Sequence, residues 1–229
     1  MPNVPDLPPL PCPADGNPYR VSSRTQVYQN PWIRVREDRF QHRRGARGGY
    51  AVCGFMHTAC GVLALDDRDR VVLVGQWRYP LEQYSWEIPE GGGEIEESPL
   101  ASIQRELAEE AGLTAGIWEP LAFFHPSNSC SDEEAFLFLA RDLAEIPGGH
   151  RPELDEELAL RREPFDQCLA RILTGEITDS LTVVALLTLQ ARRAGAPPAM
   201  DAALAERFFQ APARHPSAGR ARWGKLEQP

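Results

Sequence analysis

The sequence contains few cysteines, and none of them are paired at a metal-binding spacing. The cysteines are odd in number, and no CxxC pair occurs among the five, which are Cys12, Cys53, Cys60, Cys130 and Cys168. A disulfide framework uses an even set of cysteines, and a structural zinc site uses closely spaced pairs. The pattern argues against both and favours free thiols in a reducing cytoplasm.

Long hydrophobic runs are also missing. The most apolar stretch, LTVVALLTL from Leu181, is much shorter than the ~20 residues that a membrane-spanning helix needs. The first residues, MPNVPDLPPLPCPADG, have neither a basic region nor an apolar core, so we expect no signal peptide. We therefore expect a soluble, cytoplasmic protein with no membrane partner.

Positive charge is scarce as well. The chain has 24 Lys and Arg residues against 33 Asp and Glu residues, which gives a formal net charge of -9. A broad basic surface for nucleic acid is thus disfavoured, and we expect no nucleic-acid partner. An acidic protein can still bind phosphates when a divalent cation lies between the two negative groups.

The 229 residues are enough for one domain with appendages, and no internal repeat is present. Both ends are rich in proline and lack hydrophobic periodicity. We expect four segments: an N-terminal arm over 1–24, N-terminal β-strands over 25–57, a main domain over 58–194 and a C-terminal extension over 195–229.

The order of the expected elements indicates the fold class. Runs rich in β-branched and aromatic residues predict strands over residues 27–40, 58–66, 70–77, 84–88, 118–124 and 134–140. Helical patterns with capping residues predict helices over residues 99–111, 164–175, 179–195 and 201–209. Strands come first, then one central helix, more strands and the last helices, which predicts an α+β layered fold.

The central helix carries an unusual group of charges. Ser98 is a suitable N-cap and Gly112 a suitable C′ residue for this helix. Within it, Glu106, Glu109 and Glu110 have i, i+3 and i+4 spacing, so their side chains converge on one face. Like charges so placed cost a few tenths of a kcal/mol per pair, and they oppose the helix macrodipole. The triplet is either a solvated acidic face or a site for a hard cation such as Mg²⁺.

The spacing around this helix decides between these interpretations. It runs from Gly91 through five residues to Glu97, then seven residues to Arg105-Glu106-Leu107, one residue, Glu109-Glu110, one residue, and Gly112-Leu113. This pattern resembles the Nudix box, G-x5-E-x7-R-E-U-x-E-E-x-G-U, at every position. The chain therefore resembles the Nudix hydrolases, which cleave nucleoside diphosphates linked to another moiety.

The resemblance implies a fold and a metal site. The fold would be an α/β/α sandwich around a mixed central sheet, preceded here by an N-terminal antiparallel sheet. Glu106, Glu109 and Glu110 would bind Mg²⁺, or alternatively Mn²⁺, with the backbone carbonyl of Glu90 as a further ligand. Arg105 would orient the carboxylates, and Glu97 would pair with Arg105.

The residues before the box point to one branch of the family. QWRYP, from Gln76 to Pro80, followed by SWEIPEGGGE resembles the ADP-ribose pyrophosphatase and nucleoside-diphosphate-sugar hydrolase branch. In this branch Arg78 would contact the phosphates or terminal ribose of the substrate, since its guanidinium suits phosphate. The alternative is a surface arginine paired with a nearby acid.

The resemblance implies further site residues outside the box. In the acidic loop, Glu156 would bind a metal or position the attacking water, with Glu157 as second choice, unless the loop is merely solvated. Ser129 and Glu134 lie in a loop that would flank the diphosphate or the terminal sugar. Trp32 would stack on the base, across a homodimer, or else it is a buried anchor of a hairpin.

We therefore expect metal-dependent hydrolysis of ADP-ribose or a related nucleoside diphosphate sugar, giving a nucleoside monophosphate and a sugar phosphate. A general base among the carboxylates, Glu109, Glu110 or Glu156, would accept the proton of the attacking water. The alternatives are a nucleotide-sugar sensor without catalysis, a Nudix nucleoside triphosphate pyrophosphatase, and an interaction protein that works through its proline-rich tails.

Overall fold

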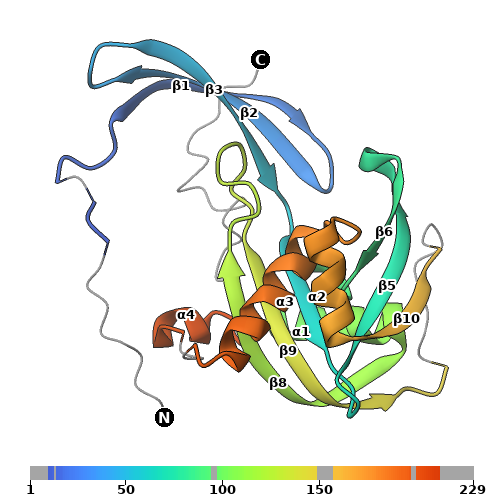
Figure 1. Cartoon of the computed structure of the whole chain (residues 1–229). Helices are drawn as coiled ribbons and strands as arrows, with labels where there is room; N and C mark the ends of the chain where they lie inside the picture. The colour runs from blue at the N-terminus through green and yellow to red at the C-terminus, as the bar shows by residue number, and fades with distance from the viewer. Residues whose placement is uncertain (1–9, 13, 94–96, 149–156, 197–199, 212–229) are drawn as a thin grey trace. The chain divides into compact units, whose positions relative to one another are not determined.

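The structure is a computed structural model that describes residues 10–12, 14–93, 97–148, 157–196 and 200–211. Its backbone separates into two compact units (Figure 1). One unit contains the chain up to His57 together with Ser127–Glu133, and the other contains Thr58–Pro126 and the described residues from Glu134 onward.

The first unit is the expected N-terminal antiparallel sheet. Strands β1 (Tyr19–Gln29), β2 (Ile33–His42) and β3 (Arg47–Phe55) pair in the order β1-β2-β3. Asn30 makes the first turn, because its side-chain Oδ1 accepts the backbone N–H groups of Trp32 and Ile33 at 2.9 and 2.7 Å. Strand β1 begins directly after Pro18 and so extends into the segment expected as an arm.

The second unit contains two sheets. Strands β7 (Glu90–Gly93), β4 (Thr58–Ala64), β9 (Ala135–Glu145) and β8 (Leu113–Phe124) form a four-stranded sheet in that order. The pairing of β4 with β9 is parallel, and the others are antiparallel, so this sheet is mixed as expected. Strands β10 (Ala159–Pro164), β5 (Arg70–Arg78) and β6 (Gln83–Glu87) form the second, antiparallel sheet, with a short 3₁₀ turn, η1 (Tyr79–Leu81), between β5 and β6.

The mixed sheet is buried on both faces, which makes the unit a layered sandwich. Alternate residues of β4 belong to two different apolar clusters. Val62 is in one with Leu107 of helix α1 (Pro99–Ala111), and Leu63 is in the other with Ala185 of helix α3 (Ser180–Arg193). Strand β9 alternates in the same way. Helices α2 (Phe165–Thr174) and α3 therefore cover one face and α1 the other (Figure 1), which confirms the α+β sandwich.

Three of the four expected helices lie within two residues of their expected bounds, and the fourth, expected over 201–209, is shorter. Helix α1 spans Pro99–Ala111, the side chain of Ser98 caps its N-terminus, and Gly112 closes it with a φ of 65°. Helices α2 (Phe165–Thr174) and α3 (Ser180–Arg193) follow β10. In the described part of the chain, no helix combines the length and apolarity needed to cross a membrane.

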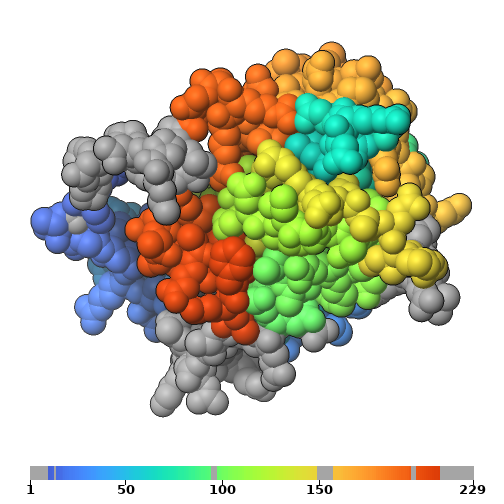
Figure 2. All heavy atoms as spheres, turned by 90° about the horizontal axis from the view of Figure 1, so that it is seen from below, coloured from blue at the N-terminus to red at the C-terminus, as the bar shows by residue number. Residues whose placement is uncertain are grey.

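Residues 200–211, within the expected C-terminal extension, pack in the second unit. A short helix, α4 (Ala202–Glu206), leads to Phe208, whose ring is fully buried against Phe136 and Phe138. The Phe208 carbonyl accepts the N–H of Leu100 in the first turn of α1 at 3.0 Å. Figure 2 shows this orange-red segment against green residues of the same unit. Part of the expected C-terminal extension thus contributes to the core.

Candidate metal and diphosphate site

The glycines before α1 allow a carboxylate to lie against the backbone. A Cβ atom on Gly91 would be 2.2 Å from the Cδ of Glu106, a distance that real Cβ atoms do not show. Any side chain at this position would therefore displace Glu106. Glycine here lets the carboxylate of Glu106 lie directly against β7.

A second carboxylate of α1 binds the start of β7 directly. Glu110 is only 3% exposed, and its Oε2 accepts the backbone N–H of Glu90 at 3.0 Å. This hydrogen bond joins the C-terminal half of α1 to the first residue of the glycine-rich strand. Glu106 and Glu110 of α1 thus both contact the Glu90–Gly91 segment.

Arg105 holds the box together from the more exposed side of α1. Its Nη1 lies 2.9 Å from both Glu106 and Glu109, and its Nη2 donates to the carbonyl of Gly92 and pairs with Glu97 at 3.6 Å. Burial lowers the pKa of this guanidinium, but the attraction of Glu106, Glu109 and Glu97 outweighs it and raises the pKa. Arg105 therefore stays charged and links helix, loop and strand.

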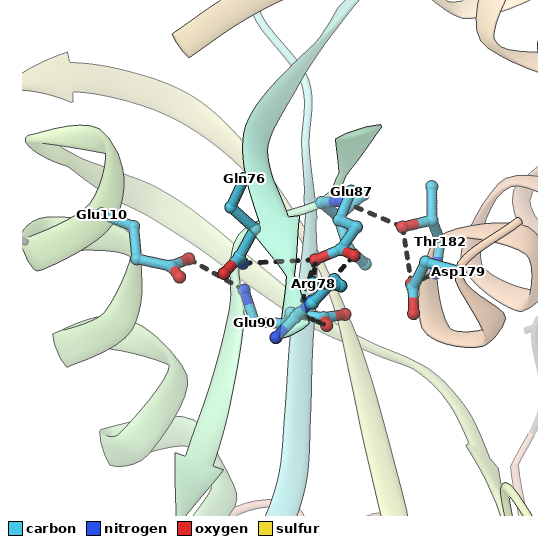
Figure 3. Close-up of polar contacts among 8 residues, drawn as sticks. Gln76, Arg78, Glu87, Glu90, Glu110, Asp179 and Thr182 are labelled. Atoms are coloured by element: carbon cyan, nitrogen blue, oxygen red, sulfur yellow. Dashed lines mark hydrogen bonds and ion pairs between the residues drawn. The ribbon is translucent and has the colours of Figure 1, made fainter. Parts of the chain in front are cut away.

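The end of β5 supplies the second arginine. The Nε of Arg78 donates to both oxygens of Glu87 at 2.9 and 3.0 Å, and its Nη2 donates to Oε1 of Glu90 at 2.6 Å. Figure 3 shows Arg78 between these two carboxylates. Gln76, which lies on β5 like Arg78, also donates a hydrogen bond to Glu87. Both acids hold the Arg78 side chain in place, while its Nη1 takes no part in these ion pairs.

The start of α3 approaches the same point from the other face of the sheet. The Oγ1 of Thr182 accepts the N–H of Ile88 at 3.0 Å and donates to Asp179 at 2.8 Å. Carboxylate oxygens of Asp179, Glu87 and Glu90 lie within 4.8 Å of one another. Three acids from β6, β7 and the cap of α3 therefore surround Arg78 (Figure 3).

The local charges do not balance. The Oε2 of Glu90 is buried and has no hydrogen-bond partner among the residues that the structure describes. Burial, followed by repulsion from Asp179 and Glu87, raises the pKa of Glu90 well above its ordinary value, although Arg78 lowers it. A group of carboxylates with one arginine fits a hard divalent cation such as Mg²⁺ or Mn²⁺ nearby. Glu110 of the expected ligand set contacts the same residue through the N–H of Glu90.

The structure brings only some of the expected site residues together. Six of them lie around β7. These are Arg78, Glu90 and four residues of α1: Arg105, Glu106, Glu109 and Glu110. Trp32 and Ser129 belong to the other compact unit. Trp32 is 66% exposed, so the alternative of a buried hairpin anchor is wrong. Glu156 lies outside the described residues.

Glu134 has a partner that the sequence did not suggest. It is buried, and its Oε2 accepts from Nη2 of Arg207 at 2.7 Å. The Arg207 guanidinium also lies 4.7 Å from the ring centre of Phe123. Glu134 therefore anchors the C-terminal segment in this structure.

Four residues of the site were missed by the analysis of the sequence. Glu87 stands in the E-x-P-x-G motif without an assigned role, and Gln76 opens the QWRYP motif. Asp179 and Thr182 have only a local signal, the pattern of an N-cap followed by a hydroxyl residue in the first turn. Nothing in that pattern relates them to Glu90, which is far away in the sequence.

Comparison with known proteins gives two family matches. The model described as "NUDIX domain" matches residues 56–188, which is more than half of the chain. The model described as "Nucleoside diphosphate sugar hydrolase N-terminal domain" matches residues 20–52. The first match includes the site around α1 and β7, and the second covers β1 and β2 and the first half of β3.

Individual proteins are similar to the chain over the same region. An ADP-ribose pyrophosphatase of Mycobacterium tuberculosis is 31% identical over 140 residues, which are 60% of this chain and 67% of the relative. An ADP-ribose pyrophosphatase of Bacillus subtilis is 32% identical over 136 residues, 59% of this chain and 74% of the relative. A crystal structure of an ADP compounds hydrolase superposes with a TM-score of 0.70 at 18% identity, covering 79% of this chain and 98% of that one.

Proposed function

The chain belongs to the Nudix family, and we propose that it hydrolyses the diphosphate bond of ADP-ribose or a related nucleoside diphosphate sugar. The products would be a nucleoside monophosphate and a sugar phosphate, which for ADP-ribose are AMP and ribose 5-phosphate. The observation that carries this proposal is the approach of two carboxylates of α1 to the start of β7, Glu106 against Gly91 and Glu110 on the N–H of Glu90. The N-terminal family match and the ADP-ribose pyrophosphatase relatives support the substrate class.

A divalent cation, Mg²⁺ or alternatively Mn²⁺, would be held by Glu106, Glu109, Glu110 and the backbone carbonyl of Glu90, with Glu156 as a further ligand. Such a cation would polarise the diphosphate, shield its negative charge and acidify a water molecule. Three contacts support this set of ligands. Glu110 is fixed to the Glu90 backbone, and Arg105 bonds to both Glu106 and Glu109.

The arginines would orient the reacting groups. Arg105 would keep Glu106 and Glu109 directed toward β7, since it bonds to both carboxylates and to the carbonyl of Gly92. Arg78 would direct Nη1 toward a substrate phosphate or the terminal ribose while Glu87 and Glu90 hold its other nitrogens. Its side chain is about one-third exposed, with a value of 35%, so a substrate can reach it.

The proton of the attacking water would pass to a carboxylate. Glu109 is the most exposed glutamate of the α1 triplet, and Glu156 on the acidic loop is the other candidate for a general base. Trp32, Ser129 and Glu134 complete the proposal as substrate contacts. The exposed indole of Trp32 suits stacking on a base, whereas Glu134 would first have to release Arg207.

A homodimer in the cytoplasm is part of the same proposal. The N-terminal sheet exposes large apolar side chains, including Tyr28 and Trp32, that a second copy could cover. All five cysteines are free thiols, which suits a reducing compartment. Light scattering after size exclusion measures the mass of the particle and would show a dimer or a monomer of 25.5 kDa.

The test of the activity is phosphatase-coupled phosphate release in the presence of Mg²⁺. ADP-ribose, GDP-mannose, UDP-glucose and ADP-glucose are offered separately to the wild type, to Glu110→Gln and to the control Asp67→Asn. Asp67 is exposed in a turn, so the control removes one negative charge away from α1.

We expect turnover of ADP-ribose by the wild type and the control, and its loss in Glu110→Gln. Comparable turnover of several nucleotide sugars would identify a broader hydrolase within the same class. Tight binding of one compound without turnover of any would contradict hydrolysis and favour a nucleotide-sugar sensor.

A further inference from the structure

We propose that the first turn of α3, through Thr182 and its cap Asp179, positions the Ile88–Glu90 segment that forms one side of the metal site. This inference rests on the proposed function, because it concerns the site where that reaction takes place. Thr182 is then a positioning residue that acts through the backbone of β7. It lies on the face of the sheet opposite to α1, outside the Nudix box.

The hydroxyl group of Thr182 is built into the interior of the protein. Thr182 is fully buried, and its Oγ1 accepts the backbone N–H of Ile88 at 3.0 Å. The same hydroxyl donates its proton to Oδ2 of Asp179 at 2.8 Å, and Asp179 also accepts the N–H of Thr182 at 2.7 Å. The proton on Oγ1 is therefore committed to Asp179, so a lone pair of Oγ1 faces Ile88.

The segment held by Thr182 is short and stiff. Ile88 is followed by Pro89, which has no N–H group and a fixed φ, and then by Glu90. Over these three residues the available backbone donors are the N–H groups of Ile88 and Glu90. Thr182 accepts the first, and Glu110 of α1 accepts the second at 3.0 Å. The two helices thus hold the two ends of one tripeptide from opposite faces of the sheet (Figure 3).

The carbonyl and the side chain of Glu90 depend on this arrangement. A shift of Ile88 would be transmitted through the rigid Pro89 to Glu90, and hence to its hydrogen bond with Glu110 and its ion pair with Arg78. Asp179 has a second effect, because its carboxylate lies within 4.8 Å of those of Glu87 and Glu90. The turn therefore fixes both the backbone position and part of the negative charge around Arg78.

Thr182→Val tests the positioning, since valine keeps the branched shape and removes only the hydroxyl group. Thr182→Ser restores the hydroxyl and serves as the conservative rescue. Thr174→Val is the matched control, because Thr174 is exposed on α2 and its hydroxyl bonds only the carbonyl of Arg171 in its own helix. The full chain is used, and binding of Mn²⁺ is measured by calorimetry at a temperature where circular dichroism shows each variant folded.

We expect Mn²⁺ to bind Thr182→Val about 10-fold or more weakly than the wild type, as for other groups that support metal ligands. The Mg²⁺ concentration for half-maximal hydrolysis should rise by a similar factor. Thr182→Ser and Thr174→Val should bind Mn²⁺ like the wild type. A purely structural role of Thr182 would lower the melting temperature and leave Mn²⁺ affinity unchanged in the folded variant, and that result overturns the proposal.

Two further results remain interpretable. If Thr182→Val does not fold, Thr182→Ala removes the same hydroxyl without placing a new methyl group beside the Ile88 N–H, and its Mn²⁺ affinity decides the question. If the wild type hydrolyses no nucleotide sugar, the proposed function fails. The loss of Mn²⁺ affinity in the variant would still support the positioning role.

Discussion

Two glutamates of the second unit, the half-buried Glu90 and the buried Glu163, have opposite surroundings. Glu163 accepts from Arg161 at 2.6 Å and from Arg171 at 2.9 and 2.7 Å. Burial raises the pKa of Glu163, but these hydrogen bonds outweigh burial, so the pKa lies below its usual value. Glu90, by contrast, pairs with Arg78, and Arg78 also pairs with Glu87.

The difference is the one expected between a structural ion network and the proposed metal site. Two arginines compensate the charge of Glu163, which joins β10 to α2 without any additional ion. The acids around Glu90 outnumber their arginine, and the pKa of Glu90 is raised instead. A carboxylate that the chain itself neutralises holds the fold together, whereas an excess of carboxylates calls for a cation from solution.

The largest effect expected from this comparison is that of Glu110→Gln. The amide keeps an oxygen for the Glu90 N–H but removes one charge from the acid-rich site. We expect hydrolysis to fall by about 10²- to 10³-fold, which corresponds to the several kcal/mol that a metal site supplies. Steady-state kinetics with ADP-ribose and Mg²⁺ measure this change. Activity within about twofold of the wild type would remove Glu110 from the site.

Gly91→Ala should have the next largest effect, because its Cβ would collide with the carboxylate of Glu106. Displacing one ligand in this way should cost about 10- to 100-fold in activity or metal affinity. The control is Gly49→Ala in β3, where the nearest atom to a Cβ is the flexible end of Arg39 at 3.1 Å. Equal activity of both variants would show that the close approach of Gly91 and Glu106 has no catalytic consequence.

Glu163→Gln tests the compensated network, and it should change stability rather than activity. Loss of charge-assisted hydrogen bonds predicts a decrease of about 2 kcal/mol in the free energy of unfolding at neutral pH. Because the folded-state pKa is lowered, this stabilisation is present above the ordinary glutamate range and is lost as pH falls through the folded pKa. Urea denaturation should therefore show that the variant loses less stability than the wild type when the pH is lowered from neutral to acid. A variant that loses activity at full stability would contradict the structural assignment.

Glu90→Gln should have the smallest effect of these four substitutions. Unlike Glu163→Gln, it should raise the free energy of unfolding at neutral pH. Burial and the carboxylates of Asp179 and Glu87 raise the pKa of Glu90, so stability is full below the ordinary glutamate pKa and decreases as pH rises toward the folded pKa. A neutral glutamine removes this decrease. We expect the metal-free variant to be more stable than the wild type at neutral pH and equal to it at acid pH. Lower stability of the variant at neutral pH would show that Glu90 is already compensated.

The part of the site on α1 was predictable because it depends on short-range spacing. Residues three and four apart lie on one helix face, so the sequence alone placed Glu106, Glu109 and Glu110 together. The ends of α1 followed from Ser98 and Gly112. The start of β1 was harder to predict, since the prolines of the first segment end at Pro18 and a regular strand follows at once.

The contribution of α3 could not be predicted in the same way. Thr182 and Asp179 reach Ile88 and Glu90 only because α3 packs on the mixed sheet through residues such as Ala185 and Leu186. Likewise, the bond between Glu134 and Arg207 depends on the return of the chain after Ala194. These contacts depend on tertiary packing, which leaves no spacing pattern in the sequence.

Calorimetric titration of the metal-free wild type and Glu110→Gln with Mn²⁺ tests the central claim most directly. If the acids around β7 form a cation site, the wild type should bind Mn²⁺ and Glu110→Gln should bind it at least about 10-fold more weakly. Equal affinities of the two proteins, or no binding by the folded wild type, would contradict the claim.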